Sequence, residues 1–150
     1  MLIKNHNQGQ SSEILFQNLC KRDNIDIKKS SKSQDRYDHI DFFVKFKNNQ
    51  RSIDIKSIKK IDGIRQEKLY YIEIYNDSGN KGWINAPKMY LLGFECFDCF
   101  KIYRRDKISE YINKKGIDKF ESRTRYKDDS LCILLPSTEI EHLIYFTLYK

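Results

Sequence analysis

The fold is indicated most clearly by the stretch from His39 to Ile58, HIDFFVKFKNNQRSIDIKSI. Two runs rich in β-branched and aromatic residues, 39–46 and 51–58, flank the short polar segment Lys47-Asn-Asn-Gln50. This pattern is typical of a β-hairpin. We therefore expect two antiparallel strands joined by a four-residue connection at 47–50.

A symmetric register around that connection pairs Asp41 with Lys56 and Phe43 with Asp54. Because side chains alternate between the two faces of a strand, Asp41, Asp54 and Lys56 share one face. The opposite face is continuously apolar and is expected to belong to the core; it carries Ile40, Phe42, Val44, Ile53 and Ile55. The hairpin thus presents two carboxylates and a lysine together.

The segments around the hairpin predict further helices and strands. An amphipathic helix of about three turns, capped by Ser11-Ser-Glu13, extends to Cys20, and a polar surface loop occupies 24–36. Strands are expected at 68–76, 88–94, 97–103 and 131–135. A helix capped by Asp106 ends at Gly116. Residues 119–129 are expected to be irregular, and a terminal helix or extended tail spans 136–148. The predicted order is α-β-β-β-(β-β)-α-β, an α/β (α+β) class with a central mixed β-sheet flanked by helices.

Length and charge limit the classes of protein to which this chain can belong. The 150 residues suit a single domain, 1–150. The 28 Lys and Arg residues outnumber the 21 Asp and Glu residues, and the net charge of +7 favours a polyanionic partner. No apolar run is long enough for a membrane span, and no signal-peptide pattern opens the sequence. We expect an intracellular protein, cytoplasmic or nucleoid-associated, that does not engage membranes.

Four cysteines offer a competing site. Cys96 and Cys99 have the spacing of half a zinc site, but the sequence contains no second such pair. We expect reduced, buried thiols at a turn between two strands.

The shared face of the hairpin suggests phosphodiester hydrolysis. Carboxylate oxygens of Asp41 and Asp54 are suitable ligands for Mg²⁺ (or Mn²⁺), which polarises a phosphate and lowers the pKa of a bound water. Lys56 beside them can orient that water or neutralise the transition state. Glu13 is a fourth member if the first helix packs along the sheet.

At these residues the chain resembles the PD-(D/E)XK nuclease superfamily. The matching positions are Asp41, Asp54-Ile55-Lys56 thirteen positions later, and Glu13 in the preceding helix. No proline precedes the first acidic residue, and Asp38 competes with Asp41 for that position. The chain looks most like small phage-type Holliday-junction resolvases and homing endonucleases. The resemblance implies a restriction-endonuclease-like core, divalent-metal-dependent cleavage of DNA, possible phage or mobile-element origin and a homodimer.

Other residues are expected to support this site. Glu73 comes close to Asp54 if its strand is the third strand of the central sheet; otherwise it is a cross-strand partner of a lysine. Basic residues that could hold the DNA backbone form three groups along the chain: Lys59 and Lys60; Arg104 and Arg105; and Arg123, Arg125 and Lys127.

The leading hypothesis is therefore a Mg²⁺-dependent endodeoxyribonuclease acting on branched or specific duplex DNA. The alternative is a non-catalytic nucleic-acid-binding protein on a nuclease-like fold. A third possibility is an interaction protein whose charge serves solubility.

Overall fold

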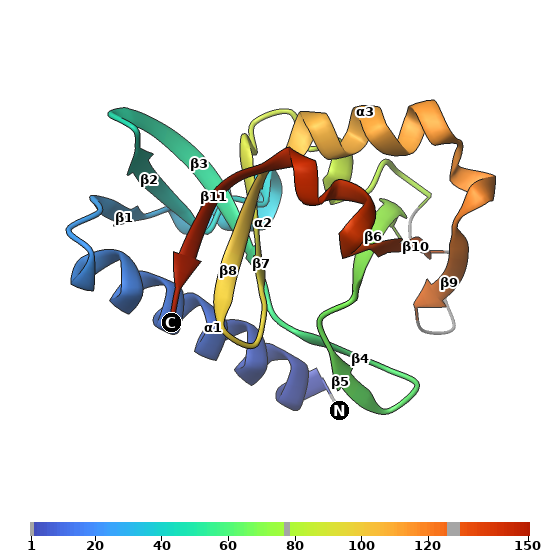
Figure 1. Cartoon of the computed structure of the whole chain (residues 1–150), viewed down its shortest axis with the longest axis horizontal. Helices are drawn as coiled ribbons and strands as arrows, with labels where there is room; N and C mark the ends of the chain where they lie inside the picture. The colour runs from blue at the N-terminus through green and yellow to red at the C-terminus, as the bar shows by residue number, and fades with distance from the viewer. Residues whose placement is uncertain (1, 77–78, 126–129) are drawn as a thin grey trace.

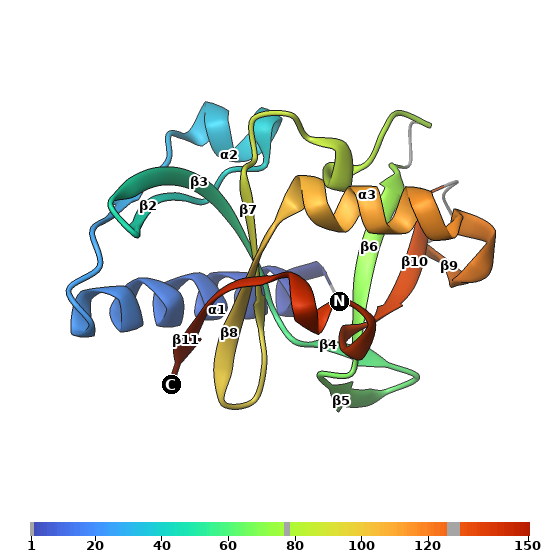
Figure 2. The ribbon, with the colours of Figure 1, turned by 45° about the horizontal axis from the view of Figure 1, so that its top comes forward.

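The computed structural model describes residues 2–76, 79–125 and 130–150; for residues 2–7 and 125 it describes the backbone only. Two sheets and two longer helices dominate the architecture (Figure 1). Helix α1 crosses strands β7 and β8, whereas helix α3 lies beside the second, smaller sheet (Figure 1 and Figure 2).

The larger sheet has six strands in the order β1-β2-β3-β7-β8-β11. Strands β3 and β7 run parallel, and the other neighbours are antiparallel. The predicted mixed central sheet is therefore confirmed. Its six strands are β1 (Ile27–Lys29), β2 (Phe42–Phe46), β3 (Asn49–Lys56), β7 (Leu91–Glu95), β8 (Cys99–Arg104) and β11 (Ile144–Tyr149). Two helices belong to the N-terminal part of the chain, α1 (Leu2–Arg22) before β1 and α2 (Lys32–Asp38) between β1 and β2.

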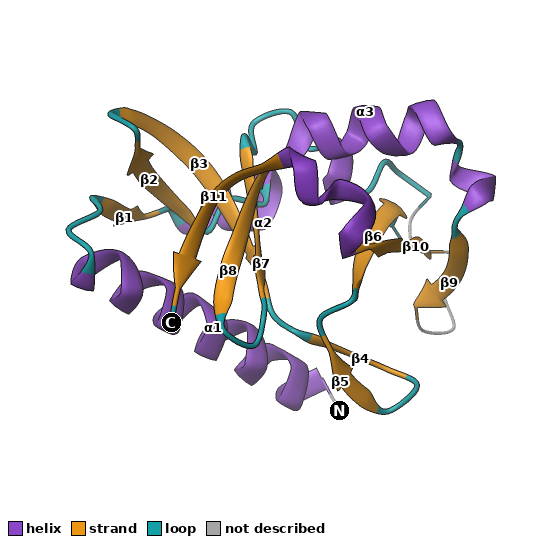
Figure 3. Cartoon of the chain, in the orientation of Figure 1, coloured by secondary structure: helices purple, strands orange, loops and turns teal. Residues whose placement is uncertain are grey.

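A second sheet of three strands has the order β6-β10-β9, and a two-stranded ribbon joins β3 to it (Figure 3). These elements and the remaining helices are β4 (Lys59–Ile61), β5 (Ile64–Gln66), β6 (Leu69–Tyr75), η1 (Trp83–Asn85), α3 (Arg105–Lys115), η2 (Ile117–Lys119), β9 (Glu121–Arg125), β10 (Ser130–Pro136) and η3 (Ser137–Leu143).

The central strands β7 and β8 are buried on both faces, as the alternation of their side chains shows. Leu91 and Ile102 pack with Phe16 of α1 on one face. Leu92 and Tyr103 point to the other face and join the core formed with α3 and the second sheet. The apolar residues of β7 are therefore continuous, as expected for a strand covered on both sides.

The predicted hairpin is present as β2 and β3, but its turn is shorter than predicted. Lys47 and Asn48 alone form the turn, with φ of 51° and 66°, and Phe42 pairs with Ile53. Two successive positive φ values are typical of the tight turns that match strand twist. The four-residue connection is therefore wrong.

The register consequently differs by two residues from the predicted one, and Phe43 lies opposite Ser52 rather than Asp54. The predicted pairing of Asp41 with Lys56 is wrong for the same reason. Because side chains repeat every second residue, a shift of two leaves every residue on its predicted face. Asp54 and Lys56 therefore still project together, away from the Ile53 and Ile55 side.

Two predictions on the N-terminal side are wrong. The first helix begins at Leu2 and not at a Ser11 cap; Ser12 lies inside it, where its buried hydroxyl donates to Gln8 O at 3.1 Å. The predicted loop at 24–36 contains β1 and most of α2, where Ser31 and Gln34 form a reciprocal capping box.

The later elements also depart from the prediction in their ends and partners. Asp106 lies inside the first turn of α3 rather than at its cap, while Gly116, at φ 100°, ends the helix as expected. Part of the predicted irregular segment 119–129 is η2 and strand β9. The predicted terminal helix or tail is a 3-10 helix, η3, followed by an edge strand, β11, on the central sheet.

Candidate functional site

Asp41 lies immediately before β2, where regular pairing with β3 ends. Its backbone N–H donates to Ile53 O at 2.9 Å, and its Oδ2 accepts the N–H of Ile55 at 2.7 Å. The residue is only 8% exposed. Its carboxyl group is thus held at a fixed position against the end of β3.

Asp54 of β3 contacts this carboxyl group and is itself 5% exposed. Burial raises the pKa of Asp41 to about 10, and the nearby charge of Asp54 and a hydrogen bond between the two carboxyl groups add to the effect. Asp41 therefore favours its protonated form at neutral pH, and the neighbouring carboxyl groups can share that proton.

Glu13 reaches the same cluster from α1, which packs on the sheet through Phe16 one turn further along. Its carboxyl group shares a hydrogen bond with Asp41. Burial is the main cause of a raised Glu13 pKa; Lys29 opposes the shift, while Asp35 and Asp54 reinforce it. The tertiary structure therefore brings Glu13, Asp41 and Asp54 together from three elements.

Lys56 completes this group from the end of β3. Its Nζ lies 2.7 Å from Oδ2 of Asp54 and 4.4 Å from the centre of the Trp83 ring. The pair is close enough for an ion pair, yet Oδ2 has no partner of hydrogen-bonding geometry among the described residues. The contact is a charge pair, because the electrostatic attraction between ammonium and carboxylate depends on their distance and little on the bond angle. The ammonium is therefore held between a carboxylate and an aromatic face.

Trp83 was not predicted as a site residue, and the tertiary structure explains its place. The backbone N–H of Trp83 donates to Glu73 Oε1 at 3.3 Å, and the backbone N–H of the preceding Gly82 donates to Ile74 O at 2.7 Å. A Cβ on Gly82 would lie 2.3 Å from Glu73 O, so only glycine allows this approach to β6. A glycine directly before the single tryptophan of the chain is the sequence signal that could have indicated this contact.

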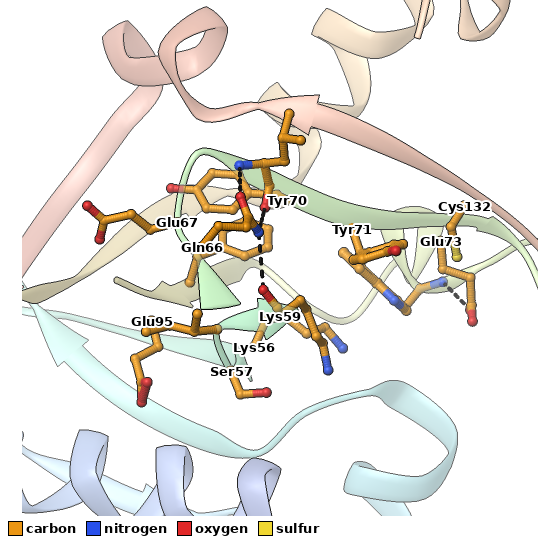
Figure 4. Close-up of a pocket in the computed structure, with 14 residues that line it drawn as sticks. Lys56, Ser57, Lys59, Gln66, Glu67, Tyr70, Tyr71, Glu73, Glu95 and Cys132 are labelled. Carbon is orange, nitrogen blue, oxygen red and sulfur yellow. Dashed lines mark hydrogen bonds between the residues drawn. The ribbon is translucent and has the colours of Figure 1, made fainter. Parts of the chain in front are cut away.

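A pocket opens beside Lys56, between β3, the β4–β5 ribbon and β6 (Figure 4). Glu73 lies on the opposite side of the pocket from Glu67 and Glu95. The condition under which Glu73 would lie near Asp54 is not met, because β7 lies beside β3 and β6 belongs to the second sheet. The alternative of a cross-strand lysine partner is not met either, since Glu73 lies opposite Cys132 on β10. Glu73 instead reaches the Lys56 side through Trp83.

Asp38, the alternative first acidic residue, lies outside the carboxylate cluster. It ends α2, and its carboxylate lies 3.8 Å from Lys88 Nζ. The geometry therefore favours Asp41 over Asp38 as the partner of Asp54.

Several of the predicted DNA-binding residues are engaged within the fold. Arg105 donates to Met89 O and Ile84 O, both at 2.8 Å, and Arg104 forms an ion pair with Asp106 at 2.7 Å. Arg105 is thus directed to the backbone of the segment that carries Trp83.

The other basic residues lie on the ribbon and the second sheet. Arg123 is paired with Glu121 at 2.7 Å and with Asp62 at 3.5 Å. Lys59 and Lys60 lie on β4. Arg125 ends β9 with only its backbone described, and Lys127 lies outside the described residues.

The cluster of Glu13, Asp41 and Asp54 is a candidate metal site. Over residues 2–76, 79–125 and 130–150, no three His, Cys, Asp or Glu side chains are arranged ready to hold a metal ion. The contacts are pairwise, Glu13 to Asp41 and Asp41 to Asp54. The donor chemistry nevertheless suits a hard divalent cation, since these are carboxylate oxygens. Buried Oδ2 of Asp54 has no partner of hydrogen-bonding geometry among the described residues, although Lys56 Nζ lies 2.7 Å from it. Binding would require Asp41 to lose its proton.

All four cysteines are free and buried, as predicted. Cys96 and Cys99 flank the turn between β7 and β8, where Cys96 N–H donates to Cys99 O at 2.7 Å. Burial raises the pKa of Cys96 to about 11, which keeps its thiol protonated and unreactive at neutral pH.

Comparison of the chain with protein-family models, with curated proteins and with solved structures finds no match. In the described part of the chain, no helix combines the length and the apolar character that a membrane crossing requires.

Proposed function

We propose that this protein is a divalent-metal-dependent endonuclease that hydrolyses phosphodiester bonds in DNA. The observation that carries the proposal is the convergence of Asp41, Asp54 and Lys56 at the end of the β2–β3 hairpin, with Glu13 joining from α1. The proposed core is restriction-endonuclease-like, and the positive net charge of the chain suits a DNA substrate.

Each residue has a role that its environment supports. Asp41 and Asp54 would hold Mg²⁺ or Mn²⁺ through their carboxylate oxygens, once Asp41 is deprotonated. The bound ion would supply polarisation of the phosphate and a water of lowered pKa. Lys56 lies beside Asp54, where its ammonium can orient the attacking water and neutralise charge on the phosphate in the transition state. Glu13 can receive the proton that Asp41 gives up, because the two carboxyl groups are already hydrogen-bonded.

Trp83 acts as a positioning residue in this scheme. Its ring lies against the ammonium of Lys56, 4.4 Å from Nζ to the ring centre, and limits where that group can move. A fixed donor contributes more to catalysis than a mobile one, because it needs no reorganisation as charge develops.

A second candidate function is DNA binding without cleavage. It is favoured by the charge balance of the cluster, in which Lys56 neutralises Asp54 and Asp41 is protonated. Such a cluster is stable without a cation. This second candidate function predicts salt-sensitive DNA binding and no metal-dependent cleavage.

The deciding experiment incubates the protein with single-stranded, duplex and four-way-junction DNA in Mg²⁺, Mn²⁺ or EDTA. Lys56→Ala and Asp54→Asn are compared with Lys68→Ala, an exposed lysine before β6. We expect metal-dependent cleavage that falls by about 10²-fold or more in both site variants and is unchanged in the control. Cleavage by Lys56→Ala at the parental rate would show that the assigned site is wrong. Binding without any cleavage would favour the second candidate.

A dimer is expected if both strands of a duplex or junction are cut. Sedimentation of the protein with and without junction DNA measures this directly. A monomer on every substrate would contradict the dimer while leaving the single-strand chemistry intact.

A further inference from the structure

An open groove lies beside the carboxylate cluster on the same side of the hairpin. It is bounded by β1, α2, the β2–β3 hairpin and the segment that precedes β7. We call it the lysine groove; its lining includes Lys28, Gln34, Phe43, Gln50, Ser52 and Lys88, together with one acidic residue, Asp38. It is separate from the pocket beside Lys56, with which it shares no lining residue.

The floor of the groove leads directly to the cluster. Phe43 and Ser52 lie opposite each other in the β2–β3 register. Gln50, Ser52 and Asp54 follow one another on the same face of β3, at about 7 Å per two-residue step. The groove lining ends at Ser52, so a ligand continuing along β3 would reach Asp54 one step further on.

Exposed lysines stand on two sides of this floor. Lys28 of β1 pairs with Phe43 in the sheet and is exposed. The side chain of Lys88 is 71% exposed, and its contact with Asp38, at 3.8 Å, is long for an ion pair. The two ammonium groups are thus available to an extended anion that spans the groove from one lysine to the other.

The position of Lys88 is set by a buried hydroxyl group. Ser52 Oγ donates to Lys88 O at 2.6 Å and accepts the N–H of Tyr90 at 2.9 Å. These two bonds attach the segment before β7 to the groove floor. The exposed lysine is therefore presented on a rigid backbone, unlike a lysine on a free loop.

We propose that the lysine groove holds the phosphate backbone of the DNA strand that enters the Asp41–Asp54 cluster, with Lys28 and Lys88 contacting its phosphates. The inference rests on the proposed function and adds the path of the substrate. Lysines on opposite sides of this floor fit an extended chain of negative charges, and Gln34 and Gln50 add neutral amide groups to the groove lining. Arg104, Arg105 and Arg123 already have partners within the fold, so they are less suited to this task.

The test is DNA binding by fluorescence anisotropy in EDTA, which prevents cleavage, at several salt concentrations. Lys28→Ala/Lys88→Ala is compared with Lys68→Ala/Lys114→Ala, which removes the same charge from exposed positions before β6 and on α3. For both single-stranded and duplex oligonucleotides, we expect the groove variant to bind about tenfold more weakly, with a salt slope lower by about 2. The control variant should stay within about twofold of the parent. Equal affinities and slopes for the two variants would overturn the proposal.

A second measurement locates the strand. Gln50→Cys and Lys68→Cys are each combined with an oligonucleotide carrying a thiol-reactive group on one phosphate; the four natural cysteines are buried. Cross-linking at position 50 but not at 68 is expected, and the reverse would refute the path. Because both measurements omit metal, they fail independently of cleavage: a protein that cuts DNA without using the groove refutes only this inference.

Discussion

The ammonium of Lys56 lies 2.7 Å from Oδ2 of Asp54, a carboxylate that is otherwise buried beside a second acidic residue. The pair joins two residues of one strand that share a face, and it is the main neutralising contact for Asp54. The stability of the fold and the proposed chemistry consequently depend on the same two side chains.

The first prediction concerns the energy of this pair. Lys56→Met keeps the aliphatic stem but leaves Asp54 without its cation, so we expect a loss of about 2 kcal/mol in the free energy of unfolding. Adding Asp54→Asn should recover about half of that loss, because the double variant buries no unpaired charge. Urea unfolding of the two single variants and the double variant measures the coupling. Strict additivity would mean that the pair contributes nothing.

The second prediction concerns Asp41 and pH. The folded pKa of Asp41, about 10, lies above its ordinary value of 3.8. Its protonation therefore supports folding fully below about pH 4, and this support is lost as the pH rises toward 10. Asp41→Asn keeps an acceptor for the Ile55 N–H and removes the titration. The variant should be more stable than the parent, by an amount that is about 4 kcal/mol larger at pH 8 than at pH 5.

Urea unfolding at the two pH values checks this expectation, with Asp38→Asn as the matched control outside the cluster. The control should change stability by the same small amount at both pH values. If Asp41→Asn shows no greater gain at pH 8, Asp41 is not protonated in the folded protein.

The third prediction concerns metal binding, which must displace the proton on Asp41. Mg²⁺ should raise the melting temperature of the parent but not that of Asp54→Asn. Affinity should increase from pH 6 to pH 8, since the carboxylate form becomes easier to reach. Calorimetry in two buffers of different ionisation enthalpy should detect proton release on binding. Binding that neither releases protons nor depends on pH would place the ion elsewhere.

The fourth prediction concerns Gly82, whose backbone lies against β6. Gly82→Ala would bring a methyl group to within 2.3 Å of Glu73 O, and the strand must move. We expect a loss of about 2–3 kcal/mol in stability and displacement of Trp83 from Lys56. Gly9→Ala is the control, since nothing lies within 4 Å of its added carbon and helix propensity should stabilise it by about 0.5–1 kcal/mol. Thermal unfolding and tryptophan fluorescence measure both effects.

The fifth prediction separates two neighbouring arginines. Arg105→Ala removes two hydrogen bonds to backbone carbonyl groups at Met89 and Ile84, and should cost about 2 kcal/mol in stability. Arg104→Ala removes a largely solvated pair with Asp106 and should change stability by about 0.5 kcal/mol or less. Chemical denaturation of both variants decides. Equal effects would contradict the structural role assigned to Arg105.

The local part of this fold could be predicted because it depends on neighbouring residues. Alternating apolar and polar side chains indicated the β2–β3 hairpin, and the same alternation placed Asp54 and Lys56 on one face. The exact turn could not be predicted from composition, since a longer connection was equally compatible with these residues. In the structure Lys47 and Asn48 both adopt positive φ and form the turn alone. The wrong turn length did not change the face on which the site residues lie, because the register moved by two residues.

The long-range part could not be predicted, because strand pairing between distant segments leaves little trace in either segment. Strand β6 has the composition of a central strand, yet it pairs with β10 in a second sheet, while β7 takes the place beside β3. Helix α2 lacks buried residues and therefore lacks the apolar period by which helices are recognised.

The amino-acid sequence alone determined which residues carry the proposed chemistry, because a strand's period of two is a local property that segregates Asp41, Asp54 and Lys56 from the apolar face. Only the tertiary structure decided their partners. Glu13 meets Asp41 because α1 packs on the sheet, Trp83 covers Lys56 because Gly82 approaches β6, and Lys88 lies above the groove because Ser52 binds its segment. These contacts depend on side-chain packing between segments far apart in the chain, which no local pattern encodes.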